Sequence, residues 1–475
     1  MHSKALAAAA ATLLLLGCSA PEPAPYGALP TPAQVKWQQM ETNMFCHFGP
    51  NTFTGAEWGD GAEPEDIFNP SGLDCLQWAS TAAAAGFKGI IITAKHHDGF
   101  CLWPNPVSTH TVAQSKWMDG KGDVLRSLSD ACREQGLGFG IYISPWDRHD
   151  SRYGTPEYND VFRRTLESAL TGYGPVFEQW LDGACGEGPS GKRQVYDWEL
   201  FDSEILSHQP DAIIFSDVGP GCRWVGNERG IAGETSWSRL DADVFTPGAG
   251  APHPDTLAAG NVYGDKWIPS ETDVSIRPGW FYRESEDLKV KSLRELLDIY
   301  YSSVGRNSLL LLNVPPDSRG RIHEADSVRL MELRSALDSI FKTDLAQGAR
   351  AKASQTRRGR HFSPKHLFDC DFDTYWAAPD GVTEASIEID LPSERKFNRL
   401  VIQEYIPLGQ RVASFKAEAL SGGEWTEIAS GTTIGYKRIL KVPDTLTGKI
   451  RIRITRSLAP PVISSVGLYM DSVCL

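Results

Sequence analysis

The sequence has no surplus of basic residues. Lysine and arginine together number 47 against 60 aspartates and glutamates, which gives a formal net charge of −13. A protein that binds nucleic acid needs a positively charged face to neutralise phosphates. The charge balance therefore argues against a nucleic-acid partner.

Long apolar runs are equally scarce. The run over residues 5–16 follows a lysine and is too short to span a bilayer as a helix, which is typical of the apolar core of a signal peptide. It ends in Leu-Leu-Gly-Cys, which resembles the bacterial lipobox, whose cysteine becomes the lipidated first residue. Here that residue is Cys18. A plain signal peptide cut by the ordinary peptidase is the alternative.

This N-terminus predicts a lipoprotein signal peptide over residues 1–17 and an extended tether, rich in proline and alanine, over residues 18–32. We therefore expect an exported protein that is anchored to a bacterial membrane through a lipid on Cys18. The sequence does not distinguish the periplasm from the cell surface.

Cysteine motifs for metal binding or redox chemistry are also absent. The sequence has nine cysteines, and no two are spaced as zinc ligands or as a redox pair. An exported protein can form disulfides, but several of these cysteines lie in apolar, strand-like runs. We expect mostly free, buried thiols.

What the sequence does contain, from about residue 37 to residue 313, is an alternation of short apolar runs with amphipathic helical stretches. The strand candidates are residues 44–48, 89–93, 139–144, 176–181, 212–216 and 308–313. The helix candidates are residues 73–85, 124–135, 157–171, 198–207 and 288–303. Many strand candidates are apolar throughout, as buried parallel strands are. The pattern predicts an α/β fold, a (β/α)8-like (TIM-type) barrel over residues 33–344, with its chemistry at the carboxyl ends of the strands.

The last part of the chain loses this alternation of strands and helices. After a helix candidate over residues 324–341, short alternating strands are predicted over residues 385–390, 399–404, 414–419, 425–429 and 449–455. Such a series is typical of an antiparallel β-sandwich. We expect a second domain of this kind, a jelly roll, over residues 345–475.

Histidines, tryptophans and carboxylates follow the predicted barrel strands. A metal site could use the histidines after the first two strands, but adjacent residues on one strand point to opposite faces. An acyl-transfer triad would need a nucleophile on a sharp turn, and no Gly-x-Ser-x-Gly occurs. Glycoside hydrolysis needs two carboxyl groups beside sugar-binding side chains. It accounts for the carboxylates, histidines and tryptophans together, so we favour it.

Longer motifs in a fixed order carry a resemblance. They are residues 44–49 (MFCHFG), 93–100 (TAKHHDGF), 180–184 (WLDGA), 223–228 (RWVGNE) and 309–316 (LLLLNVPP). With these motifs the chain resembles glycoside hydrolase family 29, the α-L-fucosidases, over roughly residues 33–340. The segment 223–228, together with 275–282 (SIRPGWFY), is similar to the subgroup that acts on α-1,3/1,4-linked fucose in branched glycans.

The resemblance implies roles for individual residues. Asp182 would be the nucleophile of a retaining enzyme and Glu228 its general acid/base, with Glu234 as the second choice for the acid/base. The implied substrate-binding residues are His47, Glu57, Trp58, His96, His97, Trp180, Arg223 and Trp280. Arg223 is expected to pair with a catalytic carboxylate. No metal or other cofactor is implied for catalysis.

The C-terminal region resembles a discoidin or coagulation-factor type C domain. The matching pieces are residues 353–354, 368–377, 386–391 and 450–454. The acidic run 369–373 is compatible with a structural calcium ion, and capping of a tight turn is the alternative.

Together these features predict a retaining α-L-fucosidase that releases terminal α-1,3/1,4-linked L-fucose from branched, Lewis-type glycans. Its partners would be fucosylated oligosaccharides or glycoconjugates, and a membrane reached through the lipid anchor. A non-catalytic glycan-binding surface lipoprotein is the alternative. A metal-dependent hydrolase built on His47, His96 and His97 is a second alternative.

Overall fold

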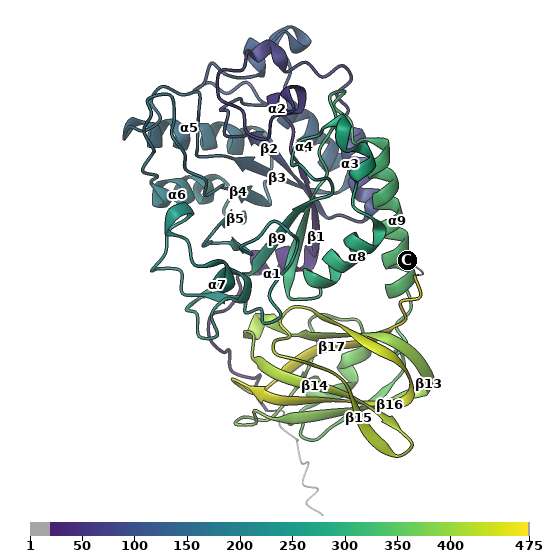
Figure 1. The fold of residues 1–475 in the computed structure, drawn as a ribbon. Coiled ribbons are helices and arrows are strands. Elements are labelled where there is room, and N and C mark those ends of the chain that lie inside the picture. Colours follow the sequence, from purple (N-terminus) through teal and green to yellow (C-terminus); the bar gives the residue numbers. More distant parts are fainter. Residues whose placement is uncertain (1–19, 474–475) are drawn as a thin grey trace, which may run out of the picture.

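The protein consists of a barrel and a β-sandwich (Figure 1). The computed structural model describes residues 20–473, so the predicted signal peptide and Cys18 lie outside the described residues. Eight strands close the barrel in the order β1-β10-β9-β6-β5-β4-β3-β2. They are β1 (Thr42–Cys46), β2 (Gly89–Lys95), β3 (Gly138–Ile143), β4 (Glu178–Trp180), β5 (Ile213–Ser216), β6 (Cys222–Trp224), β9 (Ser270–Ser275) and β10 (Ser308–Asn313). All neighbouring pairs are parallel, which confirms the predicted TIM-type barrel.

Helices alternate with most of these strands and pack around the barrel. They are α3 (Cys75–Ala85), α4 (Val124–Gln135), α5 (Glu157–Gly172), α6 (Trp198–His208), α7 (Pro254–Ala259), α8 (Leu293–Ser302) and α9 (Glu324–Phe341), while α2 (Pro50–Thr54) is a single turn after β1. Local sequence sets the ends of α3: the Asp74 carboxylate accepts a hydrogen bond from the Gln77 backbone N–H, and Gly86 adopts the left-handed conformation that follows the last turn.

Apolar side chains fill the barrel as well as the layer between strands and helices. The interior cluster includes Phe45, Ile91, Tyr142, Trp180, Phe215, Leu309 and Leu311. The Trp180 ring stacks on Phe215 with their centroids 3.6 Å apart. Packed aromatic layers of this kind make the barrel a solid core whose carboxyl end can hold side chains in fixed positions.

The C-terminal domain is an antiparallel sandwich, as predicted. It comprises β11 (Arg350–Ala353), β12 (Trp376–Ala377), β13 (Ala385–Glu404), β14 (Val412–Ser421), β15 (Glu424–Gly431), β16 (Arg438–Ser457) and β17 (Val462–Tyr469). The first half of β13 pairs with β11 and the end of β16, whereas its second half pairs with β17 and the start of β16. A register shift after Asp390 interrupts the pairing of β13 with β16 between these two halves.

The segment ahead of the barrel runs along the sandwich. The Ala20 N–H donates to the Arg358 carbonyl at 2.7 Å, and the Tyr26 N–H donates to the Leu408 carbonyl at 3.1 Å. The chain then forms α1 (Pro32–Met40), which covers the amino-terminal end of the barrel. The N-terminal segment therefore contacts the last domain before it contacts the first.

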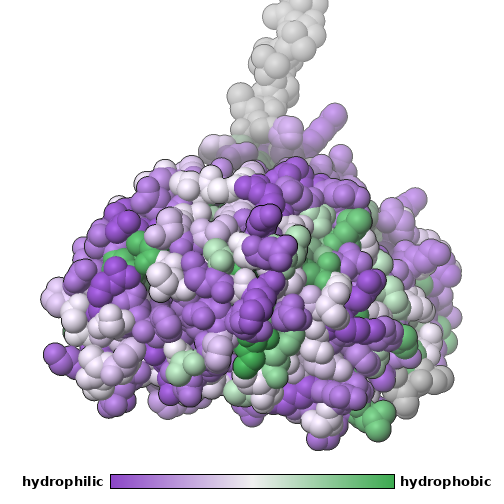
Figure 2. Space-filling model, turned by 90° about the horizontal axis from the view of Figure 1, so that it is seen from above, coloured by the Kyte–Doolittle hydropathy of each residue, from purple (hydrophilic) through white to green (hydrophobic). Residues whose placement is uncertain are grey.

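Polar residues dominate the end of the barrel that lies opposite the sandwich. Seen from that side, hydrophobic residues form only small, separate patches (Figure 2). Within residues 20–473, no helix has the length and apolar character needed to cross a membrane. The cysteines in this part of the chain are free thiols, and most of them are buried, which confirms that prediction for the described residues.

Candidate active site

A cavity of about 160 Å³ opens at the carboxyl ends of the barrel strands. Its lining residues are Phe45, His47, Glu57, Trp58, His96, His97, Tyr142, Trp180, Asp182, Ala184, Glu228, Asp273 and Trp280. Every predicted site residue of the barrel lies here except Arg223 and Glu234. The cavity thus brings together two predicted catalytic carboxyl groups, three histidines and three tryptophans.

Asp182 follows β4 and is held by two hydrogen-bond donors. The Tyr142 hydroxyl donates to Asp182 Oδ2 at 2.8 Å, and the Ala184 backbone N–H donates to Asp182 Oδ1 at 2.7 Å. Burial raises the pKa of Tyr142 well above its usual value, so this phenol keeps its proton and remains a donor. The Asp182 side chain is still 27% exposed. It is therefore fixed in orientation and accessible from the cavity.

Glu228 reaches the same cavity from the loop that follows β6. Its Oε2 accepts a hydrogen bond from the Trp280 indole N–H at 3.2 Å. Partial burial raises the pKa of Glu228, and the negative charges of Asp182 and Glu57 raise it further. Glu228 therefore keeps its proton to a higher pH than an exposed glutamate does, as a general acid must.

Two of the cavity histidines are held by the protein at Nδ1. His47 Nδ1 lies 2.9 Å from Asn313 Oδ1, and His97 Nδ1 lies 2.7 Å from the Ser144 hydroxyl. The Asn313 amide N–H donates to the Trp280 carbonyl, and the Ser144 hydroxyl donates to the Trp146 carbonyl. His47 must therefore donate from Nδ1, because the Asn313 oxygen is only an acceptor. His97 Nδ1 and the Trp146 carbonyl share the Ser144 hydroxyl, and His97 Nε2 lies 3.8 Å from Asp182 Oδ2.

Burial keeps these rings neutral. It lowers the pKa of His47 to about 3 and that of His97 to about 4. The Nε2 atom of His47 is then a hydrogen-bond acceptor. In the described part of the chain, His96 Nδ1 is buried and has no hydrogen-bond partner. The cavity therefore offers several ring nitrogens to hydroxyl groups of a ligand.

The opposite wall is built by Glu57 and Trp280. Glu57 Oε1 accepts a hydrogen bond from the Trp280 backbone N–H at 2.7 Å, and its Oε2 pairs with Arg283. The Trp280 ring lies 4.9 Å from the His47 ring. At the rim the Trp58 side chain is 57% exposed, so it offers an open indole face next to the cavity.

The structure corrects the prediction for Arg223. This residue is 0% exposed and its guanidinium lies away from the cavity, where it donates to the backbone carbonyls of Leu257, Ile268 and Trp237. No catalytic carboxylate pairs with it among the described residues. Arg223 holds the loops after β6 together instead of binding substrate.

Replacing Arg223 by methionine is expected to destabilise the protein by about 2–4 kcal/mol, because three buried carbonyls lose their donor. The measurement is the midpoint and slope of urea unfolding. The matched control is Arg229→Met, which changes an exposed arginine in the same loop and should alter the free energy of unfolding by less than about 0.5 kcal/mol. An equally small effect of Arg223→Met would contradict the structural role.

The structure also places Glu234 outside the cavity. Its side chain is 66% exposed and forms ion pairs with Arg306 and Arg438. With its carboxylate held by two arginines outside the cavity, Glu234 cannot reach a bound sugar. Of the two glutamates considered from sequence, only Glu228 lines the cavity.

Several functional residues were not identified from sequence. Tyr142, which contacts Asp182, lies within an apolar strand and carries no motif of its own. Asp273 on β9 also lines the cavity, and it accepts a hydrogen bond from the Trp224 indole N–H at 2.9 Å. Strand alternation is the signal that could have found Tyr142, because it lies near the carboxyl end of β3, two residues before Ser144, and residues two apart on a strand share a face.

The cavity histidines do not form a metal-binding group. Within residues 20–473, the sets of three or more side chains close enough to share an ion are Glu167 with Glu204 and His208, and Glu178 with Cys222 and Glu271. In the sandwich, Asp369 accepts hydrogen bonds from Thr374 and His366, as a turn-capping carboxylate does. The calcium site stays a prediction.

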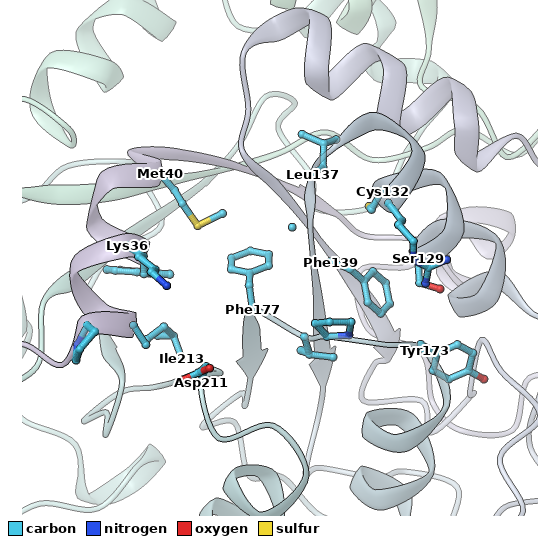
Figure 3. Close-up of a pocket in the computed structure, with 17 residues that line it drawn as sticks. Lys36, Met40, Ser129, Cys132, Leu137, Phe139, Tyr173, Phe177, Asp211 and Ile213 are labelled. Carbon is cyan, nitrogen blue, oxygen red and sulfur yellow. The ribbon is translucent and has the colours of Figure 1, made fainter.

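A second cavity, of about 500 Å³, lies at the other end of the barrel strands. Figure 3 shows Met40 and Phe177 pointing toward its middle, and Lys36 and Asp211 at its edge. Its walls come from α1 and from the amino ends of β3 and β5. Active sites of TIM barrels lie at the carboxyl ends of the strands, so this cavity is not the catalytic one.

A TIM barrel with two carboxyl groups, neutral histidines and exposed tryptophan around a small cavity at its carboxyl end defines a glycoside hydrolase. Comparison with known proteins narrows this class. The Alpha-L-fucosidase family model matches residues 26–338, and the F5/8 type C domain model matches residues 350–465. The chain belongs to the α-L-fucosidase family and is an α-L-fucosidase that acts on fucose-containing glycans.

Similar proteins extend over almost the whole chain. Alpha-L-fucosidase 1 of Arabidopsis thaliana is 44% identical over 460 residues, which cover 95% of this chain and 89% of the plant protein. The structure of a Ruminococcus gnavus fucosidase in complex with fucose is 34% identical, with a TM-score of 0.87, covering 97% of this chain and 98% of the other. The structure named SpGH29 is 37% identical, with a TM-score of 0.89, covering 94% and 100%.

Proposed function

We propose that the protein is a retaining α-L-fucosidase in which Asp182 is the nucleophile and Glu228 the general acid/base. The observation that carries this proposal is the pairing in one cavity of a carboxylate fixed by Tyr142 and Ala184 with a glutamate whose pKa is raised. Family membership and the presence of both carboxyl groups argue against the non-catalytic alternative.

The reaction proceeds in two steps. In the first, an Asp182 oxygen attacks the anomeric carbon while Glu228 donates its proton to the leaving glycosidic oxygen. This breaks the bond to the acceptor sugar and leaves fucose bound to Asp182 through an ester. In the second step, Glu228 removes a proton from water, and the hydroxide attacks the same carbon and releases Asp182 as a carboxylate. Two inversions give net retention.

The surrounding residues bind the sugar. The Nε2 atom of His47 accepts a hydrogen bond from a fucose hydroxyl, because this ring is neutral and donates from Nδ1 to Asn313. The neutral His97 ring contacts the sugar beside Asp182. The aromatic rings that line the cavity supply an apolar wall for the methyl group of fucose. His96, Glu57, Trp180 and Trp280 complete the sugar site.

We further propose terminal α-1,3/1,4-linked fucose of branched, Lewis-type glycans as the substrate. The motifs at residues 223–228 and 275–282 support this linkage, and the exposed Trp58 at the rim provides a surface for a second sugar branch. The lipobox-like sequence supports export and a lipid anchor on Cys18 at the membrane.

The test is release of fucose from a Lewis-type trisaccharide, an α-1,2-fucosylated trisaccharide and 4-nitrophenyl α-L-fucoside. The proposed specificity predicts that kcat/KM on the Lewis-type sugar exceeds that on the α-1,2-linked sugar by at least about tenfold, the contribution of a few rim contacts. NMR of the first product formed should show the α-anomer of fucose. Release of the β-anomer would exclude a retaining mechanism, and faster release from the α-1,2-linked sugar would exclude the proposed linkage.

A further inference from the structure

Glu228 sits on a loop that is anchored at both ends. At the near end, the Val225 N–H donates to the carbonyl of Glu271 at 3.0 Å, which fixes the loop to barrel strand β9. Next to Glu228, the Asn227 side-chain amide donates to the carbonyl of Ile231 at 2.9 Å and so closes a local turn. The position of Glu228 therefore depends on where the chain beyond Ile231 is held.

The far end of this loop is held by the sandwich. The Ser236 N–H donates to the Thr433 hydroxyl at 2.9 Å, and the Ser238 N–H donates to Gln410 Oε1 at 2.8 Å. The Gln410 amide donates in return to the Ser236 carbonyl at 2.9 Å. Thr433 and Gln410 are 1% and 0% exposed, so these bonds lie in an interface that excludes water. Buried, mutually satisfied hydrogen bonds of this kind fix a backbone in one conformation.

Arginines from both domains also hold the backbone of this loop near Glu234. Arg438, at the start of sandwich strand β16, donates to the Glu234 carbonyl at 2.9 Å and to Glu234 Oε2 at 2.8 Å. Arg306, from the barrel, pairs with the other Glu234 oxygen and donates to the Ala232 carbonyl at 3.0 Å. The backbone at Glu234 is therefore clamped between barrel and sandwich, six residues after Glu228.

We propose that the C-terminal sandwich is a positioning element for catalysis: through Arg438, Thr433 and Gln410 it sets the place of Glu228 over the fucose site. This inference rests on the proposed role of Glu228. In this proposal Glu234 has a structural role as the ion-pair partner of Arg306 and Arg438. The sandwich contributes to bond cleavage without touching the sugar.

The physical reason lies in the geometry of proton transfer. A general acid works only within hydrogen-bond reach of the leaving oxygen, and a displacement of about 1 Å can cost about 100-fold in rate. Asp182 follows a barrel strand and needs no such support. Glu228 comes from a loop, so its placement has to be supplied by contacts further along the chain.

The test compares two substrates whose leaving groups differ in how much they need protonation by a general acid. A nitrophenolate leaves with little protonation, whereas a sugar alkoxide requires it. Arg438→Met and Thr433→Val should lower kcat/KM on the Lewis-type trisaccharide about tenfold and on 4-nitrophenyl α-L-fucoside by less than about twofold. The basic limb of the pH profile should move as well, because the surroundings of Glu228 change. Thr433→Val keeps the shape of the side chain, so it tests the inference even if Arg438→Met folds poorly.

Lys441→Met is the matched control. Lys441 also lies on β16 and also pairs with the barrel, through Asp298 Oδ1 at 2.5 Å, but it does not contact the loop of Glu228. Its loss should change both substrates by less than about twofold. Equal losses on the two substrates in Arg438→Met and Thr433→Val, or no loss in either, would overturn the positioning role.

The variant Glu228→Gln distinguishes failure of the positioning role from failure of the acid/base assignment of Glu228. If Glu228→Gln shows a strong dependence on the leaving group and the sandwich variants do not, only the positioning role fails. If Glu228→Gln itself affects both substrates equally, the acid/base assignment fails, and the positioning role fails with it.

Discussion

Asp182→Ala is expected to lower kcat/KM by at least about 1,000-fold on every fucoside, including those with activated leaving groups. Without the carboxylate no glycosyl–enzyme ester can form, and the positive charge that develops at the anomeric carbon loses its counter-charge. The fold should survive, because Asp182 is partly exposed and the space that it leaves opens to the cavity, where water can accept from Tyr142 and Ala184. Steady-state rates together with thermal unfolding of the variant measure both effects.

Rescue by azide and a control variant at a neighbouring carboxyl test the assignment of Asp182 further. Azide can enter the space that Asp182 leaves and attack the anomeric carbon directly, so Asp182→Ala should form the inverted, β-configured fucosyl azide. The control is Asp217→Asn, which neutralises a carboxyl that follows the next strand and accepts a hydrogen bond from Gly248. Its activity should stay within about tenfold of the wild type. An Asp182→Ala enzyme with a tenth of the normal activity would refute the assignment.

Glu228→Gln is expected to lower kcat/KM on a glycan by about 100- to 10,000-fold, the usual contribution of a general acid. Its pH dependence follows from the sign of its pKa change. Burial and the charges of Asp182 and Glu57 raise this pKa, so the proton that catalysis needs is kept to a higher pH. In the wild type kcat/KM should fall as pH rises through this pKa, and Glu228→Gln should lack that fall.

The measurement is a pH profile of kcat/KM for the wild type, Glu228→Gln and Glu234→Gln on the Lewis-type trisaccharide. Glu234→Gln should keep the fall at high pH, since its side chain lies outside the cavity and pairs with Arg306 and Arg438. If the fall disappears in Glu234→Gln and persists in Glu228→Gln, the two glutamates must exchange roles.

Most barrel strands could be predicted because they contain or adjoin short clusters of apolar residues, but β6 and β9 could not. The sequence of β9, Ser-Glu-Thr-Asp-Val-Ser, contains more polar than apolar residues, although every one of them is buried. Its inward-facing carboxyl groups have partners inside the barrel: Glu271 accepts a hydrogen bond from Trp180, and Asp273 accepts one from Trp224. Hydrophobic pattern cannot reveal a strand whose interior positions are satisfied by hydrogen bonds from distant residues.

The site could be predicted where its residues follow strands within long motifs, as Asp182 and His97 do. Arg223 was assigned wrongly because a motif gives the identity of a residue and not the direction of its side chain. From β6 it points to backbone carbonyls of neighbouring loops, and no local pattern records those carbonyls. The contacts between the loop of Glu228 and the sandwich join residues about 200 positions apart, which is beyond the range of any sequence motif.

The path of the N-terminal segment has a mechanical consequence. A pull on the chain ahead of Ala20 is transmitted first to the sandwich, through the bonds at Arg358 and Leu408, before it reaches α1. The Arg411 guanidinium, which donates to the Ala24 carbonyl at 2.8 Å, shares that load. Force applied ahead of Ala20 therefore loads the sandwich before the barrel. The domain that meets such a force first is thus the one whose residues Thr433 and Arg438 also hold the loop of Glu228.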